Sequence, residues 1–217
     1  LEHNQPKWEI FKLKEYNTMA DNMTTSQYAK TRAQARQMAF DLYDVVKLNE
    51  GYKPAAYKDT KGNMTIGVGF NLESPINRKY LEQKYGLTYD DVVNKGVELN
   101  DKQIKDLYVF SMRNAYEDAK AFDPKLEQRP HHVRLATLDL AFNLGRLKLL
   151  GGVDSQGNKV KGFVNMRKAL ANDDYKTAAA EMKDSNWYSQ VKTRGPRMVG
   201  IMQDPSNLTK LLNELRK

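Results

Sequence analysis

The segment PHHVRLATLDLAFNLG, residues 130–145, constrains the fold more than any other part of the sequence. Past its first turn it carries apolar side chains on almost every side, so a helix formed from it has no face suited to water. Pro130 suits the first position of a helix, and Gly145 suits the position just after its end. The segment therefore predicts a buried central helix.

Helical periodicity dominates the rest of the chain. Residues 26–50 carry apolar positions at helical spacing and stop before Gly51, which suits the position after a helix end. Residues 101–122 form the longest uninterrupted helical pattern and are long enough to connect two lobes. Thr88 and Asp91 have the spacing of a capping box. Shorter helices are expected from Pro75 to Gly86, at 163–171, at 174–184, and along a C-terminal stripe of Leu208, Leu211, Leu212 and Leu215.

Two stretches are expected to be extended. Residues 55–59 and 64–70 predict a short hairpin with DTKGN as its turn, in which Gly67 and Gly69 let backbones approach closely. Residues 146–162 predict a loop or a second small hairpin with a turn at DSQGN. The predicted fold class is therefore mainly α with a small β hairpin (α+β).

The length of 217 residues fits one domain, or two lobes that share a long helix. We divide the chain into an N-terminal extension, residues 1–35, and one domain, residues 36–217. Within that domain we expect an N-lobe at about 36–100, which holds the hairpin, and a helical C-lobe at about 101–217. No apolar run approaches the ~20 residues that a membrane-spanning helix needs, and the opening residues lack the apolar core of a signal peptide. No stable membrane insertion is expected.

The charge balance favours an anionic partner. Lys and Arg number 35 against 27 Asp and Glu, which gives a net charge of +8. Nucleic acid, anionic lipid and bacterial cell wall are all anionic enough to attract such a surface. The charges are scattered, however, so solubility alone is an alternative explanation. No basic stripe is interleaved with aromatic residues, and nucleic-acid binding is not predicted.

Motifs for several other chemistries are missing from the sequence. It has no G-x-S-x-G, no H-E-x-x-H, no Walker A loop and no Rossmann glycine pattern. It also has no Cys, which excludes disulfides, thiol nucleophiles and thiolate metal sites. His131 and His132 fall in the first turn of a predicted helix and are interpreted as surface histidines. No cofactor and no metal is therefore predicted.

Glu50 and Asp59 are candidate catalytic carboxylates, one at the end of a helix and one in the hairpin that follows. A glycosidase needs one carboxylic acid to protonate the leaving oxygen and a second carboxylate to activate water. Glu50, beside Tyr52 and at the edge of an apolar helix face, could be desolvated and keep its proton to higher pH. Asp59, in a turn near water, would stay ionised. The alternative is that Glu50 is an ordinary exposed acid and Asp59 an Asx-turn residue.

The stretch NEGYKPAAYKDTKGNMTIGVGF, residues 49–70, resembles the signature of the phage T4-type lysozymes, glycoside hydrolase family 24. In that family E-G, Y-x-D-T-x-G and T-I-G-x-G carry the site, and the spacing here matches without a gap. LDLAFNLG resembles the central helix of the family, and the Gly162–Phe163 pair resembles the turn that follows it. NWYSQVKTRGPRMV resembles its W-Y-x-Q-x-x-x-R-x-x-R segment. The match covers roughly residues 36–203.

The resemblance implies a lysozyme-like, two-lobed fold and muramidase activity, which is hydrolysis of the β-1,4 bond between N-acetylmuramic acid and N-acetylglucosamine. It implies that Glu50 is the general acid, and that Asp59 and Thr65 hold the attacking water, with inversion at the anomeric carbon. It also implies a set of substrate-binding residues, which are Gly69, Phe142, Asn143 and Arg194.

Some of these roles have alternatives. Arg194 matches the family arginine that approaches the catalytic acid, yet it could instead pair with a surface acid. Phe142 lies in so apolar a helix that a place in the core is an alternative. Trp187 and Tyr188 are interpreted as packing residues. Phe70 replaces the usual His of the family, so an ion pair that often supports the hairpin is expected to be missing.

The leading hypothesis is a monomeric phage-type muramidase that acts on peptidoglycan glycan strands in host lysis or as part of a virion. Such an enzyme would stay in the host cytoplasm until a holin releases it to the periplasm, or would be carried in the virion. A lytic transglycosylase cleaves the same bond without a bound water, which leaves Asp59 and Thr65 unexplained. A non-catalytic peptidoglycan-binding or virion module is a further alternative, although both acids are retained. Residues 1–35 are expected to pack on the domain or to dock on another phage protein.

Overall fold

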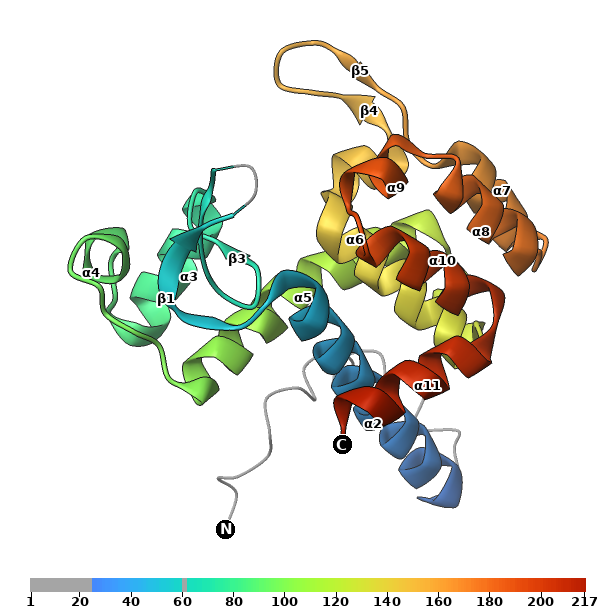
Figure 1. Ribbon diagram of the computed structural model, residues 1–217, viewed down its shortest axis with the longest axis horizontal. Helices are drawn as coiled ribbons and strands as arrows, with labels where there is room; N and C mark the ends of the chain where they lie inside the picture. The colour runs from blue at the N-terminus through green and yellow to red at the C-terminus, as the bar shows by residue number, and fades with distance from the viewer. Residues whose placement is uncertain (1–24, 60–61) are drawn as a thin grey trace. The chain divides into compact units, whose positions relative to one another are not determined.

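The computed structural model describes residues 25–59 and 62–217, with side chains described from residue 33 onward (Figure 1). The chain is mainly α with small antiparallel sheets, as predicted. In chain order its elements are α2 (Thr25–Glu50), β1 (Lys53–Lys58), β2 (Met64–Gly67), β3 (Phe70–Asn71), α3 (Pro75–Tyr85), α4 (Tyr89–Val93), α5 (Asp101–Phe122), a 3-10 turn η2 (Leu126–Gln128), α6 (His131–Leu150), β4 (Gly152–Val153), β5 (Lys159–Val160), α7 (Val164–Ala171), α8 (Tyr175–Lys183), α9 (Asn186–Gln190), α10 (Arg194–Gln203) and α11 (Pro205–Leu215).

The described chain divides into two compact units. The first contains residues 46–59 and 62–112, and the second contains residues 25–45 and 113–217. Both division points fall inside helices, α2 and α5. The predicted extension and the predicted lobe boundary stay predictions, and residues 1–24 lie outside the described residues.

In the first unit, three strands form an antiparallel sheet in the order β1-β2-β3. The predicted strand 64–70 is in fact two strands, because Gly67 (φ 68°) and Gly69 (φ 70°) turn the chain between β2 and β3. Gly67 also allows close packing, since a Cβ added there would lie 3.1 Å from Cγ2 of Ile104 on α5. The sheet can therefore approach α5 closely at this point.

The helices of the first unit begin and end where local capping chemistry predicts. Thr88 and Asp91 form the expected capping box at the start of α4, with side chain and backbone bonded reciprocally. α3 ends at Gly86, which is left-handed (φ 67°) and donates from its N–H to the carbonyl of Glu82. The apolar faces of these elements meet in a core of Ile66, Val68, Phe70, Leu72, Leu81, Val92, Ile104 and Leu107.

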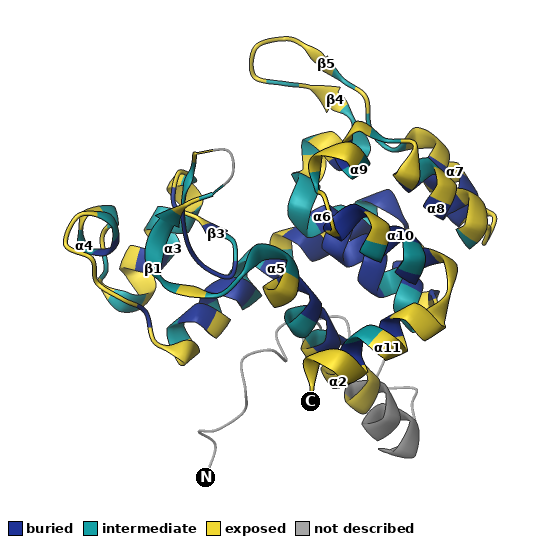
Figure 2. Cartoon of the chain, viewed as in Figure 1, coloured by how far each residue is buried: buried dark blue, intermediate teal, exposed yellow. Residues whose placement is uncertain are grey.

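In the second unit, α6 is the predicted buried helix, and Figure 2 shows its buried stretch in dark blue. α10 packs against α6 and against α8, and α11 also contacts α6. Two details differ from the sequence prediction. Pro130 is the N-cap and His131 begins the helix, and after a break at Gly145 (φ 69°, ψ 170°) the chain continues as helix to Leu150. Residues 146–150 are therefore helical and do not form the predicted loop.

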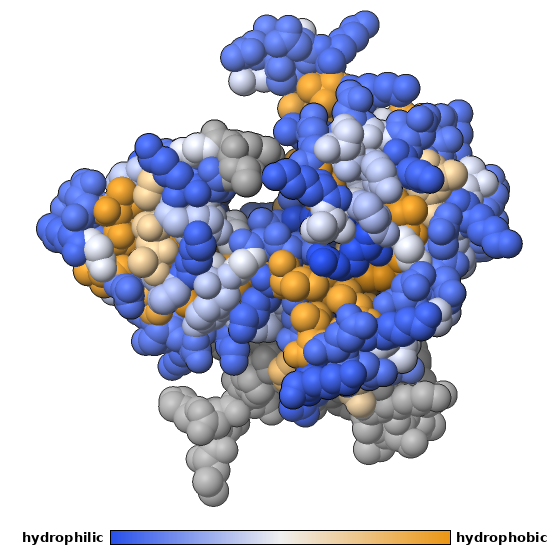
Figure 3. Space-filling model, viewed as in Figure 1, coloured by the Kyte–Doolittle hydropathy of each residue, from blue (hydrophilic) through white to orange (hydrophobic). Residues whose placement is uncertain are grey.

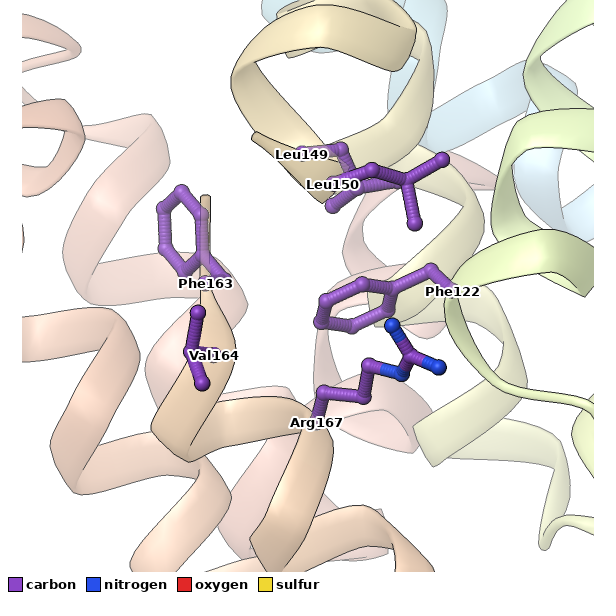
Figure 4. A pocket seen from close by; sticks show the side chains of 6 residues that line it. All are labelled: Phe122, Leu149, Leu150, Phe163, Val164 and Arg167. Atoms are coloured by element: carbon purple, nitrogen blue, oxygen red, sulfur yellow. The ribbon is translucent and has the colours of Figure 1, made fainter. Parts of the chain in front are cut away.

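The second hairpin forms where DSQGN predicts a turn. β4 pairs with β5 through Gly152 with Val160 and Val153 with Lys159. Figure 3 shows mostly hydrophilic residues over the tip of this hairpin. A small pocket in the second unit is lined by Phe122, Leu149, Leu150, Phe163, Val164 and Arg167 (Figure 4). None of the predicted site residues lines this pocket.

No helix in the part of the chain that the structure describes has the length and apolar character needed to cross a membrane.

Candidate active site

The three predicted catalytic residues all lie in the first unit. Glu50 is the last residue of α2, Asp59 directly follows β1, and Thr65 lies on β2. The antiparallel register pairs Thr65 with Tyr57, and Lys58 with Met64. Asp59 and Thr65 are therefore at the same end of the hairpin.

Glu50 lies at the junction of α2 and β1 and is half-buried. Gly51 is left-handed (φ 83°), and its N–H donates to the carbonyl of Lys47 (2.9 Å), which ends the helix. The hydroxyl of Tyr57 donates to the backbone carbonyl of Glu50 (3.4 Å). This contact links the end of α2 to β1 beside the Glu50 side chain.

Tyr57 is a site residue that the sequence pattern does not predict, although it is the Tyr of the Y-x-D-T-x-G motif. Burial raises the pKa of its phenol, and the negative charges of Glu50 and Asp59 raise it further. Lys53 Nζ lies 4.4 Å from the ring centroid. The Tyr57 phenol is therefore neutral at neutral pH and serves as the hydrogen-bond donor to the backbone carbonyl of Glu50.

The carboxylate of Asp59 is held by Asn63, the last residue of the turn. The N–H of Asn63 donates to Oδ1 (2.8 Å), and its side-chain Nδ2 donates to Oδ2 (3.0 Å). The N–H of Asp59 donates to the Asn63 carbonyl (2.9 Å). Asp59 is therefore an Asx-turn residue, as the alternative interpretation expects, and the direction of both its carboxylate oxygens is set by the same contacts.

Thr65 is buried, with 4% of its surface exposed. Its hydroxyl donates to the carbonyl of Asn63 (3.2 Å). A hydroxyl has one hydrogen to donate and two lone pairs. Once the hydrogen is donated to Asn63, Oγ1 can still accept a hydrogen bond from water. Asn63, which the sequence pattern does not predict, thereby links Thr65 to Asp59.

Gly69, a predicted substrate-binding residue, lies against the side chain of Glu50. It is left-handed (φ 70°), and a Cβ added there would lie 3.1 Å from Cγ and 3.4 Å from Cδ of Glu50. The glycine therefore gives the Glu50 side chain the room that it occupies. Contact of Gly69 with substrate stays a prediction.

Phe70 supports the hairpin by apolar packing. It is buried on β3, with 1% of its surface exposed, and its ring centroid lies 6.4 Å from that of Phe110 on α5. Phe110 in turn stacks on Tyr80 of α3, with centroids 3.8 Å apart. Aromatic contacts thus hold β3 in place at Phe70. The resemblance implies that relatives have a His at this position, which often forms an ion pair.

Phe142 and Asn143 lie on α6 in the second unit, just before the break at Gly145, and both are half-buried. Oδ1 of Asn143 accepts a hydrogen bond from Nε1 of Trp187 (2.8 Å). Trp187 is buried, with 4% of its surface exposed, in agreement with its interpretation as a packing residue. The roles of Phe142 and Asn143 in substrate binding stay predictions.

Arg194 begins α10 and makes a two-point ion pair with Asp139 of α6, inside the second unit. Its Nε donates to Oδ2 of Asp139 (2.9 Å) and its Nη2 donates to Oδ1 (3.1 Å). Arg194 is 5% exposed and Asp139 is fully buried. Arg194 therefore pairs with an acid, but the alternative is wrong about its place, because Asp139 is buried in α6 and is not a surface acid. The approach of Arg194 to the catalytic acid stays a prediction.

Asp139 is a third residue whose role the motifs do not predict. The sequence does carry a signal that could identify this residue, which is an acid in the middle of the apolar segment LATLDLAFNLG. A charge buried in such a helix requires a partner.

Asp139→Ala should lower the free energy of unfolding by about 3–5 kcal/mol, because it leaves the Arg194 charge buried without its partner. The matched control is Asp118→Ala, which removes the partially exposed pair with Arg146 (3.3 Å) and should cost less than about 1 kcal/mol. Urea unfolding followed by circular dichroism measures both. Replacing the pair with Asp139→Leu and Arg194→Met together should cost less than Asp139→Ala alone. Equal small losses for the two single Ala variants would contradict the expectation.

The histidines do not assemble a metal site within the described ranges, where no group of three or more His, Cys, Asp or Glu could hold an ion. Nε2 of His131 lies 2.7 Å from Oδ2 of the buried Asp41, which also accepts hydrogen bonds from Gln37 and Arg216. Burial by itself would raise the pKa of Asp41, but these hydrogen bonds outweigh it and lower the pKa. The network holds the start of α6 and the end of the chain to α2.

Two curated relatives from Dictyostelium discoideum are similar to this chain. "Probable T4-type lysozyme 2" is 24% identical over 173 residues, which cover 76% of this chain and 95% of that protein. "Probable T4-type lysozyme 1" is 25% identical over 169 residues, with the same coverage of 76% and 95%. No family model matches the chain. The resemblance to T4-type lysozymes that the motifs predict is therefore confirmed by similarity over 76% of this chain to proteins of that name.

Proposed function

We propose that this protein is a muramidase, a glycoside hydrolase that cleaves the β-1,4 bond between N-acetylmuramic acid and N-acetylglucosamine in bacterial peptidoglycan. The observation that carries the proposal is that Asn63 joins Asp59 to Thr65, while the Tyr57 hydroxyl of the same hairpin donates to the backbone carbonyl of Glu50. An inverting glycosidase requires an acid, a base and a held water, and these residues supply the groups. The names of the Dictyostelium relatives agree with this proposal.

In the proposed mechanism, Glu50 starts protonated and gives its proton to the glycosidic oxygen of the leaving sugar. Asp59 starts ionised and accepts one hydrogen of a water molecule, while Oγ1 of Thr65 accepts the other. Because the Thr65 hydroxyl already donates to Asn63, it meets this water as an acceptor. The water oxygen then attacks the anomeric carbon from the face opposite the leaving oxygen, so the product has the inverted configuration.

The remaining parts of the proposal concern the setting of this reaction. The net charge of +8 favours contact with an anionic cell envelope. Gly69, Phe142, Asn143 and Arg194 are proposed to contact substrate. Action in host lysis or in a virion, the place of action, the monomeric state and docking through residues 1–35 all stay predictions from the sequence.

Product analysis tests the proposal directly. Purified peptidoglycan is digested in water enriched in oxygen-18, and the fragments are identified by mass spectrometry. A muramidase leaves reducing N-acetylmuramic acid ends that carry the label, and early products have the α configuration by NMR. Unlabelled 1,6-anhydro ends would identify a transglycosylase, and labelled N-acetylglucosamine ends would identify cleavage of the other bond. Release of no fragments would favour a binding or structural module.

Gly69→Ala should slow fragment release more than the matched variant Gly86→Ala. Both glycines have positive φ, so each alanine adds a strain of about 1–2 kcal/mol. Only the alanine at position 69 meets Glu50, because a Cβ at position 86 has nothing within 4 Å. We expect similar losses of thermal stability and a loss of turnover confined to Gly69→Ala. Equal turnover in the two variants would show that Gly69 does not position Glu50.

A further inference from the structure

Asn63 joins the two groups that are proposed to hold water. Its backbone N–H and its Nδ2 donate to different oxygens of Asp59, at 2.8 and 3.0 Å. Its carbonyl accepts both the N–H of Asp59 (2.9 Å) and the hydroxyl of Thr65 (3.2 Å). We call these contacts between the first and last residues of the turn the Asp–Asn clasp. Asn63 therefore bonds both the Asp59 carboxylate and the Thr65 hydroxyl.

The chain contains a second Asp–Asn clasp, in the hairpin of β4 and β5. DSQGN, residues 154–158, matches DTKGN, residues 59–63, at the Asp, Gly and Asn positions. Asn158 donates from its N–H to Oδ1 of Asp154 (2.8 Å) and from Nδ2 to Oδ2 (3.1 Å), and the N–H of Asp154 donates to the Asn158 carbonyl (2.9 Å). The strand registers also correspond, since Val160 occupies the place of Thr65.

The two clasps differ in what surrounds them. At the second clasp Val160 stands in the place of Thr65 and has no hydroxyl. Formation of the turn is therefore enough to explain that clasp. The hydrogen bonds from the backbone and from the side chain of Asn158 lower the pKa of Asp154. At the first clasp the Asn63 carbonyl also accepts the hydroxyl of the buried Thr65.

We propose that Asn63 is a positioning residue for the hydrolytic water. Its side-chain amide and its carbonyl hold the Asp59 carboxylate and the Thr65 hydroxyl so that both accept hydrogen bonds from one water molecule. Each carboxylate oxygen has about two acceptor positions, and the clasp uses one on each oxygen. This inference rests on the proposed function.

Other charged or titratable groups near the first clasp also affect the pH dependence. They are Glu50 at the end of α2, Tyr57 and Lys58 on β1, and Glu73, whose Oε1 accepts from the N–H of Met64 on β2 (3.3 Å). A pH–rate profile reports all of them together. Asp59 therefore has to be observed directly as well.

The test compares Asn63→Ala with Asn158→Ala in the full chain. Alanine keeps the backbone donor and carbonyl and removes only the side-chain amide, so the two variants make the same change in two clasps. Three properties are measured: the carboxyl titration of Asp59 by carbon-13 NMR, with the resonance assigned through Asp59→Asn; the pH profile of turnover on peptidoglycan; and the melting temperature. A third variant, Asn63→Asp, places a second carboxylate beside Asp59 and should therefore have a larger effect on its titration than Asn63→Ala.

For Asn63→Ala we expect Asp59 to titrate at higher pH, the acidic limb of the rate profile to move the same way, and turnover at neutral pH to fall about tenfold. Asn63→Asp should move the acidic limb further, because a like charge opposes ionisation. Asn158→Ala should change the melting temperature to a similar extent and leave the Asp59 titration and the turnover as in the wild-type protein.

The inference would be overturned if Asn63→Ala changed only the melting temperature and left the Asp59 titration, the acidic limb of the rate profile and the turnover as in the wild-type protein. Asn63 would then have a structural role alone. Failure of the proposed function is a separate result that needs no Asn63 variant, since a wild-type protein that releases no peptidoglycan fragments would establish it. In that case the NMR titration still measures whether Asn63 controls Asp59.

Discussion

Glu50→Gln is expected to abolish the release of peptidoglycan fragments while the fold stays intact. Glutamine has nearly the same shape but cannot donate a proton to the glycosidic oxygen, and a positioned general acid contributes about 10²–10⁴-fold to a rate. Because no second acid serves this step in the proposed mechanism, the variant should fall to the background of the assay. Rates are measured as soluble labelled fragments released per enzyme molecule.

The fold should survive this change because Glu50 ends α2. A negative charge at the C-terminal end of a helix is unfavourable by about 0.3–1 kcal/mol, so its removal should not lower the free energy of unfolding. Glu98→Gln, at an exposed position of the same unit, is the matched control and should keep full activity. Turnover near the wild-type rate in Glu50→Gln would disprove its role as the acid.

Asp59→Asn is expected to remove most of the turnover, because an amide cannot accept a proton from water. The variant should also lose a part of the Asp–Asn clasp, since one of the two acceptor oxygens becomes an NH₂ group facing an Asn63 donor. That loss should lower the free energy of unfolding by about 1 kcal/mol. Asp154→Asn makes the same change in the second clasp and should cost similar stability without any loss of turnover.

Azide provides a second readout for Asp59→Asn. As an anionic nucleophile it needs no base to remove a proton, so it should restore bond cleavage in this variant and give a glycosyl azide that mass spectrometry detects. Glu50→Gln lacks the acid and should not be restored. Wild-type turnover in Asp59→Asn, or equal losses in Asp59→Asn and Asp154→Asn, would contradict the assignment of Asp59 as the base.

The prediction of helices and turns from the sequence succeeded where short-range chemistry decides the structure. The capping box of Thr88 and Asp91, the helix 101–122 and both D-x-x-G-N turns depend on residues within a few positions of one another. The strand predicted over residues 64–70 was wrong because apolar alternation continues through Gly67 and Gly69. Their positive φ angles, which the pattern does not show, turn the chain between β2 and β3.

The site was predicted in part for the same reason. Glu50, Asp59 and Thr65 stand in one continuous motif, so their spacing was visible in the sequence. Tyr57 is part of that motif, but its hydrogen bond to the backbone carbonyl of Glu50 depends on how β1 returns to the end of α2. The sequence predicts Asn63 only as part of the turn, because its contacts with Asp59 and Thr65 depend on the hairpin register.

Periodicity, capping and turn chemistry are enough to predict that this chain is mainly helical, that a hairpin follows the helix ending at Glu50, and that an apolar helix is buried near its middle. These determinants act between residues that are only one or two helical turns apart. The pairing of Arg194 with Asp139, 55 residues away in the sequence, depends instead on how the helices pack. A buried charge takes the partner that the packing of α6 against α10 brings to it, and that choice is not contained in either local sequence.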